Sequence, residues 1–266
     1  MKKGKLKFII VGAALIWAAV LTLGNNEVPN AKKDASVECK TVLSGSETSA
    51  HTIETTVPVV DESHVIAGVP HIYQGEAYPT GCESAAAAAL LNYYGYDITV
   101  GEFIDRYLPQ TDRPVDGGDG NLYGESPYEY FIGDPRSQNG FGCYAPVIEK
   151  AMNEYLDGTG AAACIVENAD MEALAKKYVS VDVPVLIWAT MYMDTPQAGK
   201  SWILPNGESF TFMRPEHALL LIGYDDDSYY FSDSLSESEI TVYSRSDCLE
   251  AFDAQGCQAI VLKKSR

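Results

Sequence analysis

The distribution of apolar and polar residues divides the chain into three parts. An uncharged apolar run extends from Phe8 to Gly24, a polar stretch follows, and apolar residues return from Val65. The polar stretch is rich in Ser, Thr, Glu, Lys and Asn, so burial cannot offset the entropy lost on ordering it. The pattern predicts a terminal segment at 1–24, a stalk or linker at 25–64 and one folded domain at 65–266.

Three segments of the domain have the composition or spacing of α-helices. Residues 83–94 contain five consecutive alanines, and Gly95 follows at a position suited to the left-handed helix cap. Further helices are expected over 144–155, where Pro146 stands near the start, and over 170–179, where apolar residues recur at helical spacing.

The second half of the domain reads as strands. Residues 183–191 form a β-branched and aromatic run, and residues 217–224 and 228–232 flank an acidic turn of three aspartates. Helices that precede an antiparallel sheet are typical of an α+β fold. We therefore expect N-terminal helices packed on an antiparallel sheet.

The N-terminal segment has the order of an export signal. A cluster of four lysines precedes the 17-residue apolar run. The run is intermediate between a cleaved signal peptide and a short membrane anchor, and no clear cleavage site follows it. Both alternatives stay open, and both predict an extracytoplasmic domain that is secreted or attached to the membrane only through this segment.

The charge of the exported part argues against nucleic acid as a partner. The whole chain has a net charge of −18, and removing residues 1–24 leaves 15 basic and 37 acidic residues, a net charge of −22. Such a surface repels nucleic acid and anionic lipid. It is compatible with a cationic substrate, although solubility alone explains it. We expect a monomer whose partner is a peptide or protein substrate.

The cysteine pattern argues against a structural metal. Six cysteines form no C-x-x-C pair and are accompanied by only four histidines, so zinc is not expected. The Gly-rich stretch with Asp116, Asp119 and Asn121 lacks the spacing of a calcium loop and reads as a surface loop. We predict no metal and no cofactor. Two disulfides are considered, Cys248 with Cys257 or Cys143 with Cys164.

Cys82 is placed as a nucleophile. Thr80 and Glu83 stand three residues apart, which predicts a capping box with Thr80 as the N-cap and Cys82 in the first turn. The positive end of the helix dipole and the free N–H groups there favour a thiolate. A small buried residue at a helix start is the alternative interpretation.

His217 is the matching candidate for the general base. It stands at the head of a predicted strand, 135 residues after Cys82, and is the only histidine deep in the domain. A cysteine early on a helix, followed by histidine about 130 to 150 residues later, is the order found in papain-like enzymes.

Several segments together resemble the bacteriocin-processing (double-glycine leader) cysteine peptidases, peptidase family 39. The resemblance covers about residues 65–264. The matching segments are Val69-Pro70 with Gln74, Gly81-Cys82 leading into Ala85 to Gly95, Gly142 to Pro146, Pro184-Val185, Glu216-His217 through Gly223-Tyr224, and Tyr230 to Asp233.

The resemblance implies a papain-like fold and four site residues. Carried over by position, Cys82 is the nucleophile, His217 is the base, Asp233 orients His217, and Gln74 helps to form the oxyanion hole. The family commonly has Asp-Pro at the last position, whereas this chain has Asp233-Ser234. Transporter domains, common in the family, are not seen in this sequence, so leader processing is not implied.

Strand parity decides whether Asp233 can reach His217. A three-residue loop of Asp225, Asp226 and Asp227 sets Asp233 opposite Leu219, as the diagonal neighbour of His217. A loop of even length puts Asp233 on the other face, unless a one-residue bulge restores the parity. We therefore expect either the short loop or a bulge.

These residues predict a thiol peptidase that hydrolyses amide bonds through a Cys-His-Asp triad and a glutamine oxyanion hole. The alternatives are a cysteine-dependent acyl transferase that uses the same site, and a noncatalytic member of the fold that binds peptides. The substrate and the cleavage specificity are not encoded in any motif that we recognise.

Overall fold

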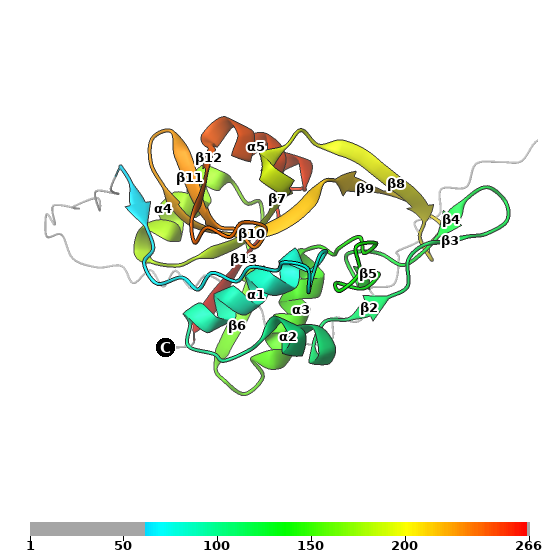
Figure 1. The fold of residues 1–266 in the computed structure, drawn as a ribbon, viewed down its shortest axis with the longest axis horizontal. Helices are drawn as coiled ribbons and strands as arrows, with labels where there is room; N and C mark the ends of the chain where they lie inside the picture. Colours follow the sequence, from blue (N-terminus) through cyan, green and yellow to red (C-terminus); the bar gives the residue numbers. More distant parts are fainter. Residues whose placement is uncertain (1–61, 265–266) are drawn as a thin grey trace, which may run out of the picture. The chain divides into compact units, whose positions relative to one another are not determined.

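Helices and short strands alternate along residues 62–264, the part of the chain that the computed structural model describes (Figure 1). The predicted signal or anchor segment and the stalk up to residue 61 lie outside the described residues. Among the helices of residues 62–264, none combines the length and apolar character needed to cross a membrane. The α-helices are α1 (Cys82–Tyr93), α2 (Val100–Arg106), α3 (Ala145–Tyr155), α4 (Met171–Lys177) and α5 (Arg245–Ala254).

Seven strands of the described chain form the large sheet, and every pair in it is antiparallel. The order is β12-β11-β10-β7-β13-β6, and β1 pairs with the far end of β10. The strands are β1 (His64–Val65), β6 (Ala161–Ile165), β7 (Val185–Thr190), β10 (Glu216–Tyr224), β11 (Ser228–Ser232), β12 (Thr241–Ser244) and β13 (Ala259–Lys264).

Helices cover both faces of the large sheet (Figure 1). Alternation along β10 sends Ala218, Leu220 and Ile222 into the core that contains α1, α2 and α3. Leu219 and Leu221 point into a second core, which contains residues of α4 and α5. The strand is therefore buried along its whole length, as a near-continuous apolar sequence requires.

Helix α1 lies in the middle of the first core. All residues from Cys82 to Leu91 are buried, because the alanine run lets the helix approach its neighbours closely. The predicted helix 83–94 is confirmed to within one residue, and Gly95 has the expected positive φ of 86°. The predicted capping box is wrong, since Gly81 is the N-cap and Thr80 Oγ1 donates to the carbonyl of Ser137.

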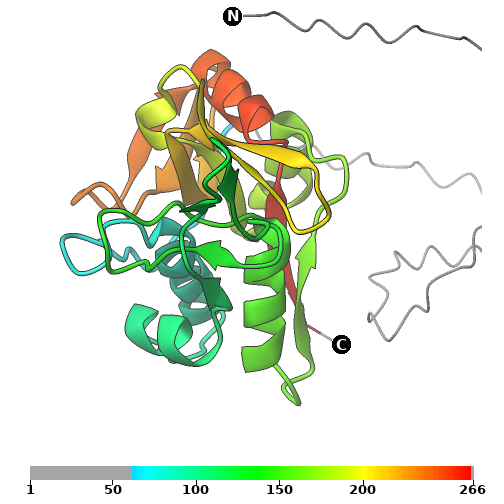
Figure 2. The same cartoon turned by 90° about the vertical axis from the view of Figure 1, so that its right-hand side faces the viewer.

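A smaller four-stranded sheet stands beside the large one, on the side that faces the viewer in Figure 2. Its long hairpin turns at Asn206-Gly207 and carries Trp202 and Phe212, which pack against Phe141. The order is β3-β4-β8-β9, with β3 (Val115–Asp116), β4 (Leu122–Tyr123), β8 (Gln197–Ile203) and β9 (Ser209–Arg214). A third, two-stranded sheet pairs β2 (Gln110–Thr111) with β5 (Phe131–Ile132).

The predicted α+β class, with N-terminal helices packed on an antiparallel sheet, is confirmed. The expected helices over 144–155 and 170–179 correspond to α3 and α4, and the expected strands to β7, β10 and β11. Helix α5 and strand β13 follow the sheet's main strands in the chain, so the helices are not confined to the first half as the sequence suggested. Asp116, Asp119 and Asn121 lie at the exposed β3–β4 turn, as expected for a surface loop.

Candidate active site

Cys82 lies at the N-terminal end of α1, at the wall of a cleft. The cleft has a volume of about 540 Å³, and Gln74, Cys82 and Glu216 all line it. The Cys82 side chain is nearly enclosed, since only 3% of the residue is exposed. The sequence-predicted nucleophile and the predicted oxyanion-hole glutamine therefore share one cleft.

The Cys82 thiol is hydrogen-bonded to a carboxyl group. Its Sγ donates to Glu83 Oε2 over 3.3 Å. Burial raises the pKa of the Cys82 thiol well above its usual range, and the nearby Glu83 and Glu216 raise it further; the Ala218 backbone N–H has a smaller, lowering effect. The expectation that the helix start favours a thiolate is therefore not met. Desolvation and two acids outweigh the helix terminus here.

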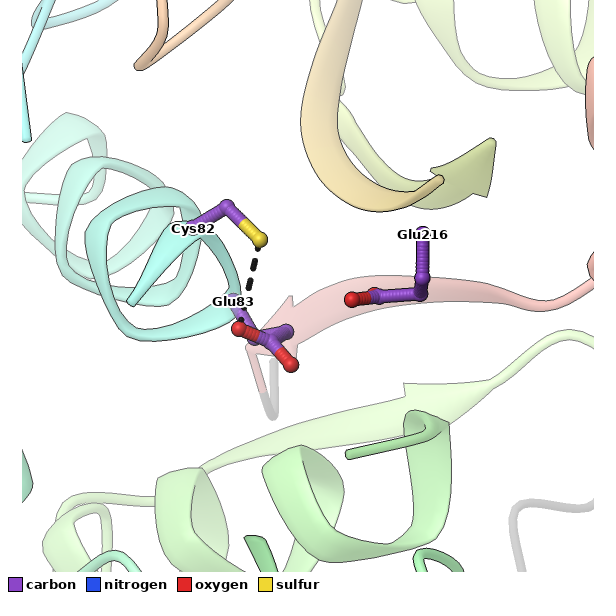
Figure 3. A group of neighbouring side chains, drawn as sticks. All are labelled: Cys82, Glu83 and Glu216. Carbon is purple, nitrogen blue, oxygen red and sulfur yellow. Dashed lines mark hydrogen bonds between the residues drawn. The ribbon is translucent and has the colours of Figure 1, made fainter. Parts of the chain in front are cut away.

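Glu83 and Glu216 form a buried acid pair beside Cys82 (Figure 3). Glu83 Oε1 accepts the backbone N–H of Cys143 at 2.7 Å, and Glu216 Oε1 is buried with no hydrogen-bond partner in the described chain. A Cβ atom added to Gly142 would lie 2.8 Å from Glu83 Oε1 and 2.7 Å from Glu216 Oε2, so the two carboxyl groups crowd the same point.

Burial raises the pKa of both carboxyl groups, and for Glu216 the neighbouring Glu83 raises it further. Two carboxylates at such close range cannot both ionise readily, so the pair retains a proton where free carboxylates have lost theirs. Ligand-type atoms of Cys82, Glu83 and Glu216 lie within 4.8 Å of one another. These residues could surround a cation only by releasing protons that burial makes them hold.

His217 and Asp233 form the second half of the site. His217 Nε2 lies 2.7 Å from Asp233 Oδ1, and both side chains are buried. Asp233 also accepts from the Leu235 backbone N–H and from the Tyr243 hydroxyl. Burial acts to raise the pKa of Asp233, but the bond and charge of His217 and the other two donors hold it below its usual range.

The ionised Asp233 determines the tautomer of His217. A carboxylate can only accept, so Nε2 carries the proton and Nδ1 is left with a lone pair. Nδ1 is buried and has no hydrogen-bond partner among the described residues. It is therefore the ring nitrogen that can take a proton from another group.

A bulge in the β10–β11 hairpin makes this contact possible. Tyr224 pairs with Tyr229, so the loop has an even count and the expected three-residue loop is wrong. The register then shifts between Leu221 and Gly223, after which Leu220 pairs with Ser232. Asp233 follows Ser232 and so projects opposite Leu219, on the face of His217. The alternative of a one-residue bulge is the geometry found.

The same alternation separates His217 from its sequence neighbour. Glu216 shares the parity of Ala218, which faces α1, whereas His217 shares that of Leu219. The Cys82 thiol accordingly meets Glu83 and Glu216, and no hydrogen bond joins Cys82 to His217 within residues 62–264. The structure brings together His217 and Asp233, and Cys82 and Gln74, but leaves the two halves unbonded.

Gln74 is held by both ends of its amide. Its Oε1 accepts from the Ser234 hydroxyl at 2.7 Å, and its Nε2 donates to the carbonyl of Tyr78 at 3.0 Å. One Nε2 hydrogen remains for a group in the cleft. Ser234, the position at which the resembled family commonly has proline, thus supplies a hydrogen bond that proline could not provide.

Three contributors to the site were not recognised as such in the sequence. Glu83 was taken as a capping residue, Glu216 only as a polar neighbour of the predicted base, and Tyr243 was not considered. For Glu216 a signal was available, because an acid at the start of an otherwise apolar buried strand needs a partner. The partners of Glu83 and Tyr243 lie far away in the sequence and could not be inferred from spacing.

Neither disulfide considered from the sequence is formed. Cys143, Cys248 and Cys257 have free thiols. Cys248 is buried in α5, and Cys257 Sγ faces Asp253 Oδ1 at 3.7 Å. Burial raises the pKa of both thiols, to about 12 for Cys248.

Comparison with known proteins places the chain in a family. Residues 66–260 match the sequence profile of the Peptidase_C39 like family. The uncharacterized protein YvpB of Bacillus subtilis (strain 168) is 26% identical over 188 residues, which cover 69% of each chain. The crystal structure of a candidate C39-like peptidase from Bacillus anthracis is 27% identical, with a TM-score of 0.66, and covers 77% of this chain and 99% of that one. The chain belongs to the Peptidase_C39 like family.

Proposed function

We propose that this protein is an extracytoplasmic thiol peptidase that hydrolyses peptide bonds with Cys82 as nucleophile, His217 as general base, Asp233 as the residue that orients His217, and Gln74 as an oxyanion donor. The observation that carries the proposal is the buried His217–Asp233 pair, in which Nε2 of His217 lies 2.7 Å from Oδ1 of Asp233. The other ring nitrogen of His217, Nδ1, has no hydrogen-bond partner among the described residues, and its strand, β10, contacts the helix that carries Cys82. Export rests on the lysine cluster and apolar run of residues 1–24.

The first chemical step forms an acyl-enzyme. The Cys82 thiol turns from Glu83 toward His217 Nδ1, gives up its proton and attacks the substrate carbonyl carbon. Because burial raises the thiol pKa, proton transfer accompanies attack rather than preceding it. The backbone N–H of Cys82 and the free Nε2 hydrogen of Gln74 stabilise the oxyanion, and loss of such a donor costs about 3 to 4 kcal/mol.

The remaining steps return the enzyme to its starting state. The protonated His217 gives its proton to the leaving amine as the carbon–nitrogen bond breaks, and a thioester with Cys82 remains. Water then attacks the thioester while His217 takes a proton from it, and Cys82 leaves and is reprotonated. One amide and one water become one carboxylic acid and one amine.

Labelling and turnover of the full chain test this proposal. We expect a peptidyl thiol-reactive probe to label the wild type at one site, and Cys82→Ala to lose both label and turnover while the far-ultraviolet circular dichroism stays native. Asp233→Ala should lower kcat by about 10²- to 10⁴-fold with little change in KM. The matched control, Asp226→Ala, removes an exposed acid of the β10–β11 turn and should leave kcat unchanged.

One observation favours a second function, a noncatalytic peptide-binding protein. The Cys82 thiol is bonded to Glu83 and not to His217. In that case the probe would label no site at Cys82, and peptides would bind the wild type and Cys82→Ala equally without being cleaved.

A further inference from the structure

Three cationic side chains line the cleft that contains Cys82: Arg113, Lys200 and Arg214. All three are exposed, and none forms an ion pair with another residue of the described chain. The one carboxyl group in the cleft wall, that of Glu216, is buried and retains its proton because burial and Glu83 raise its pKa. The side chains that line the cleft therefore carry positive charge.

Packing directs two of these cations toward the cleft. A Cβ atom on Gly199 would lie 2.9 Å from both Cγ and Cδ of Arg214, so the stem of Arg214 lies against β8 next to Lys200. The guanidinium of Arg113 stands 5.5 Å from the centre of the Phe141 ring. Glycine at position 199 leaves the space that the Arg214 stem occupies, and Phe141 supports Arg113 by a cation–π contact.

Apolar side chains also line the cleft, two of them aromatic. Phe141 and Phe212 line the cleft and pack edge to face, with ring centres 5.6 Å apart. Met191 adds a third apolar side chain to the lining. The cleft thus combines three cations with apolar side chains, and Cys82 lines the same cleft.

This charge is opposite to that of the molecule. The chain has 37 acidic and 19 basic residues, so most cations should find an acidic neighbour by proximity alone. Three cations without an ion-pair partner, gathered in one cleft, do not serve solubility, because the acidic surface already provides it. Their arrangement fits a ligand that brings its own negative charge.

We propose that the cleft binds peptides that carry an acidic side chain next to the scissile bond, with Arg113, Lys200 and Arg214 as the specificity-determining residues. That the bound peptide has a scissile bond rests on the proposed function, but the preference for an acidic side chain in binding does not. Each exposed ion pair increases affinity by about 1.5- to 5-fold, so engagement of two cations favours an acidic peptide by roughly 2- to 25-fold. It excludes the cationic substrate with which the net charge alone was compatible.

Binding to the full-length Cys82→Ala chain tests the proposal without any turnover. The probes are fluorescent peptide pairs that differ only by Glu or Gln at one position, scanned along the sequence, and the readout is the change in anisotropy on titration. We expect at least one position where Glu binds about tenfold more tightly than Gln. The double reversal Arg113→Glu with Arg214→Glu should invert this preference, whereas Lys150→Glu, an exposed site on α3 that lies outside the cleft, should keep it.

The outcomes separate the two proposals. Equal binding of Glu and Gln peptides at every position, or an unchanged ratio in the double reversal, overturns the acidic preference even if wild-type protein cleaves both peptides. Tight binding of Glu peptides that wild-type protein never cleaves upholds the preference and overturns the peptidase.

Discussion

At the scale of single residues, the main feature is a thiol held in its neutral form. Cys82 donates to Glu83, and the Glu83–Glu216 pair next to it retains a proton because burial raises the pKa of both carboxyl groups. A neutral thiol is a poor nucleophile and is also resistant to oxidation. For a protein proposed to act outside the cytoplasm, this arrangement protects Cys82 until the proposed proton transfer to His217.

We predict that Glu216→Gln makes Cys82 more reactive. Removing Glu216 lowers the thiol pKa, because at the high pH where the thiol ionises Glu216 has also lost its proton, and its negative charge opposes the thiolate. In the wild type the rate of iodoacetamide alkylation at Cys82, measured by peptide mass spectrometry, should rise about tenfold per pH unit between pH 6 and 9. In Glu216→Gln the same profile should shift to lower pH.

Glu154→Gln is the matched control, since Glu154 is exposed on α3. Its alkylation profile should coincide with that of the wild type. A Glu216→Gln profile that also coincides, or one that moves to higher pH, would show that the acid pair does not set the thiol pKa.

At the scale of elements, strand β10 distributes the site residues over its two faces. Glu216 faces α1 and joins Glu83, while His217 faces the side of β11 and joins Asp233. The bulge between Leu221 and Gly223 is essential, because without it the even loop would turn Asp233 away from His217. One bulged residue therefore decides whether the pair can form.

Much of this element structure could be predicted from the sequence, because its determinants are local. The alanine run with Gly95 defines α1, and alternation in parity shows that Asp233 needs either a short loop or a bulge to reach His217. Choosing between them was not possible from local sequence, since Gly223 at the bulge also pairs with Val65 of β1, about 160 residues away.

Two other features were not predicted, the β8–β9 hairpin and the burial of Glu83, and only the hairpin had a signal in the sequence. The β8–β9 hairpin carries Asn206-Gly207 between alternating strands, which is a strong hairpin signal and could have been used. The burial of Glu83 had no such signal, because Cys143, the residue whose N–H it accepts, is 60 residues distant. A glutamate in a first helical turn is normally an exposed cap, so local rules favoured the wrong role.

We predict that Gly142→Ala destabilises the protein by at least about 2 kcal/mol more than Gly95→Ala. Both glycines have positive φ, 128° and 86°, so both substitutions strain the backbone. Only the Gly142 methyl would meet the two carboxyl groups at 2.7 and 2.8 Å, whereas nothing lies within 4 Å at Gly95. Urea unfolding measures the free energy of unfolding of both variants. Equal losses would show that the carboxyl groups of Glu83 and Glu216 move aside without an energetic penalty.

At the scale of the whole molecule, the site joins parts that are distant in the chain. The proposed nucleophile comes from α1, the proposed base from β10, and two of the cleft cations from the β8–β9 hairpin of the smaller sheet. The cleft is therefore assembled only when both sheets are formed. Its charge is the reverse of the net −18 of the chain, so an acidic substrate is repelled at a distance and attracted at contact.

Buried Glu216 and Asp233 make the free energy of unfolding depend on pH in opposite directions, Glu216 at high pH and Asp233 at low pH. An unfolded glutamate releases its proton near pH 4.3, but folded Glu216 holds it to a much higher pH because burial and Glu83 raise its pKa. The folded state then binds more protons than the unfolded state, so the free energy of unfolding falls as pH rises, by up to about 1.4 kcal/mol per pH unit for each retained proton. Asp233 acts in reverse: its pKa is lowered overall, so its stabilising effect is complete above about pH 3.9 and is lost as the solution becomes more acidic.

We therefore predict a stability maximum at mildly acidic pH, measured by urea unfolding between pH 3 and 9. Glu216→Gln should flatten the decline above the maximum and leave the acidic side unchanged, while Glu154→Gln should reproduce the wild-type curve. Parallel wild-type and Glu216→Gln curves above the maximum would mean that Glu216 ionises in the folded protein without penalty.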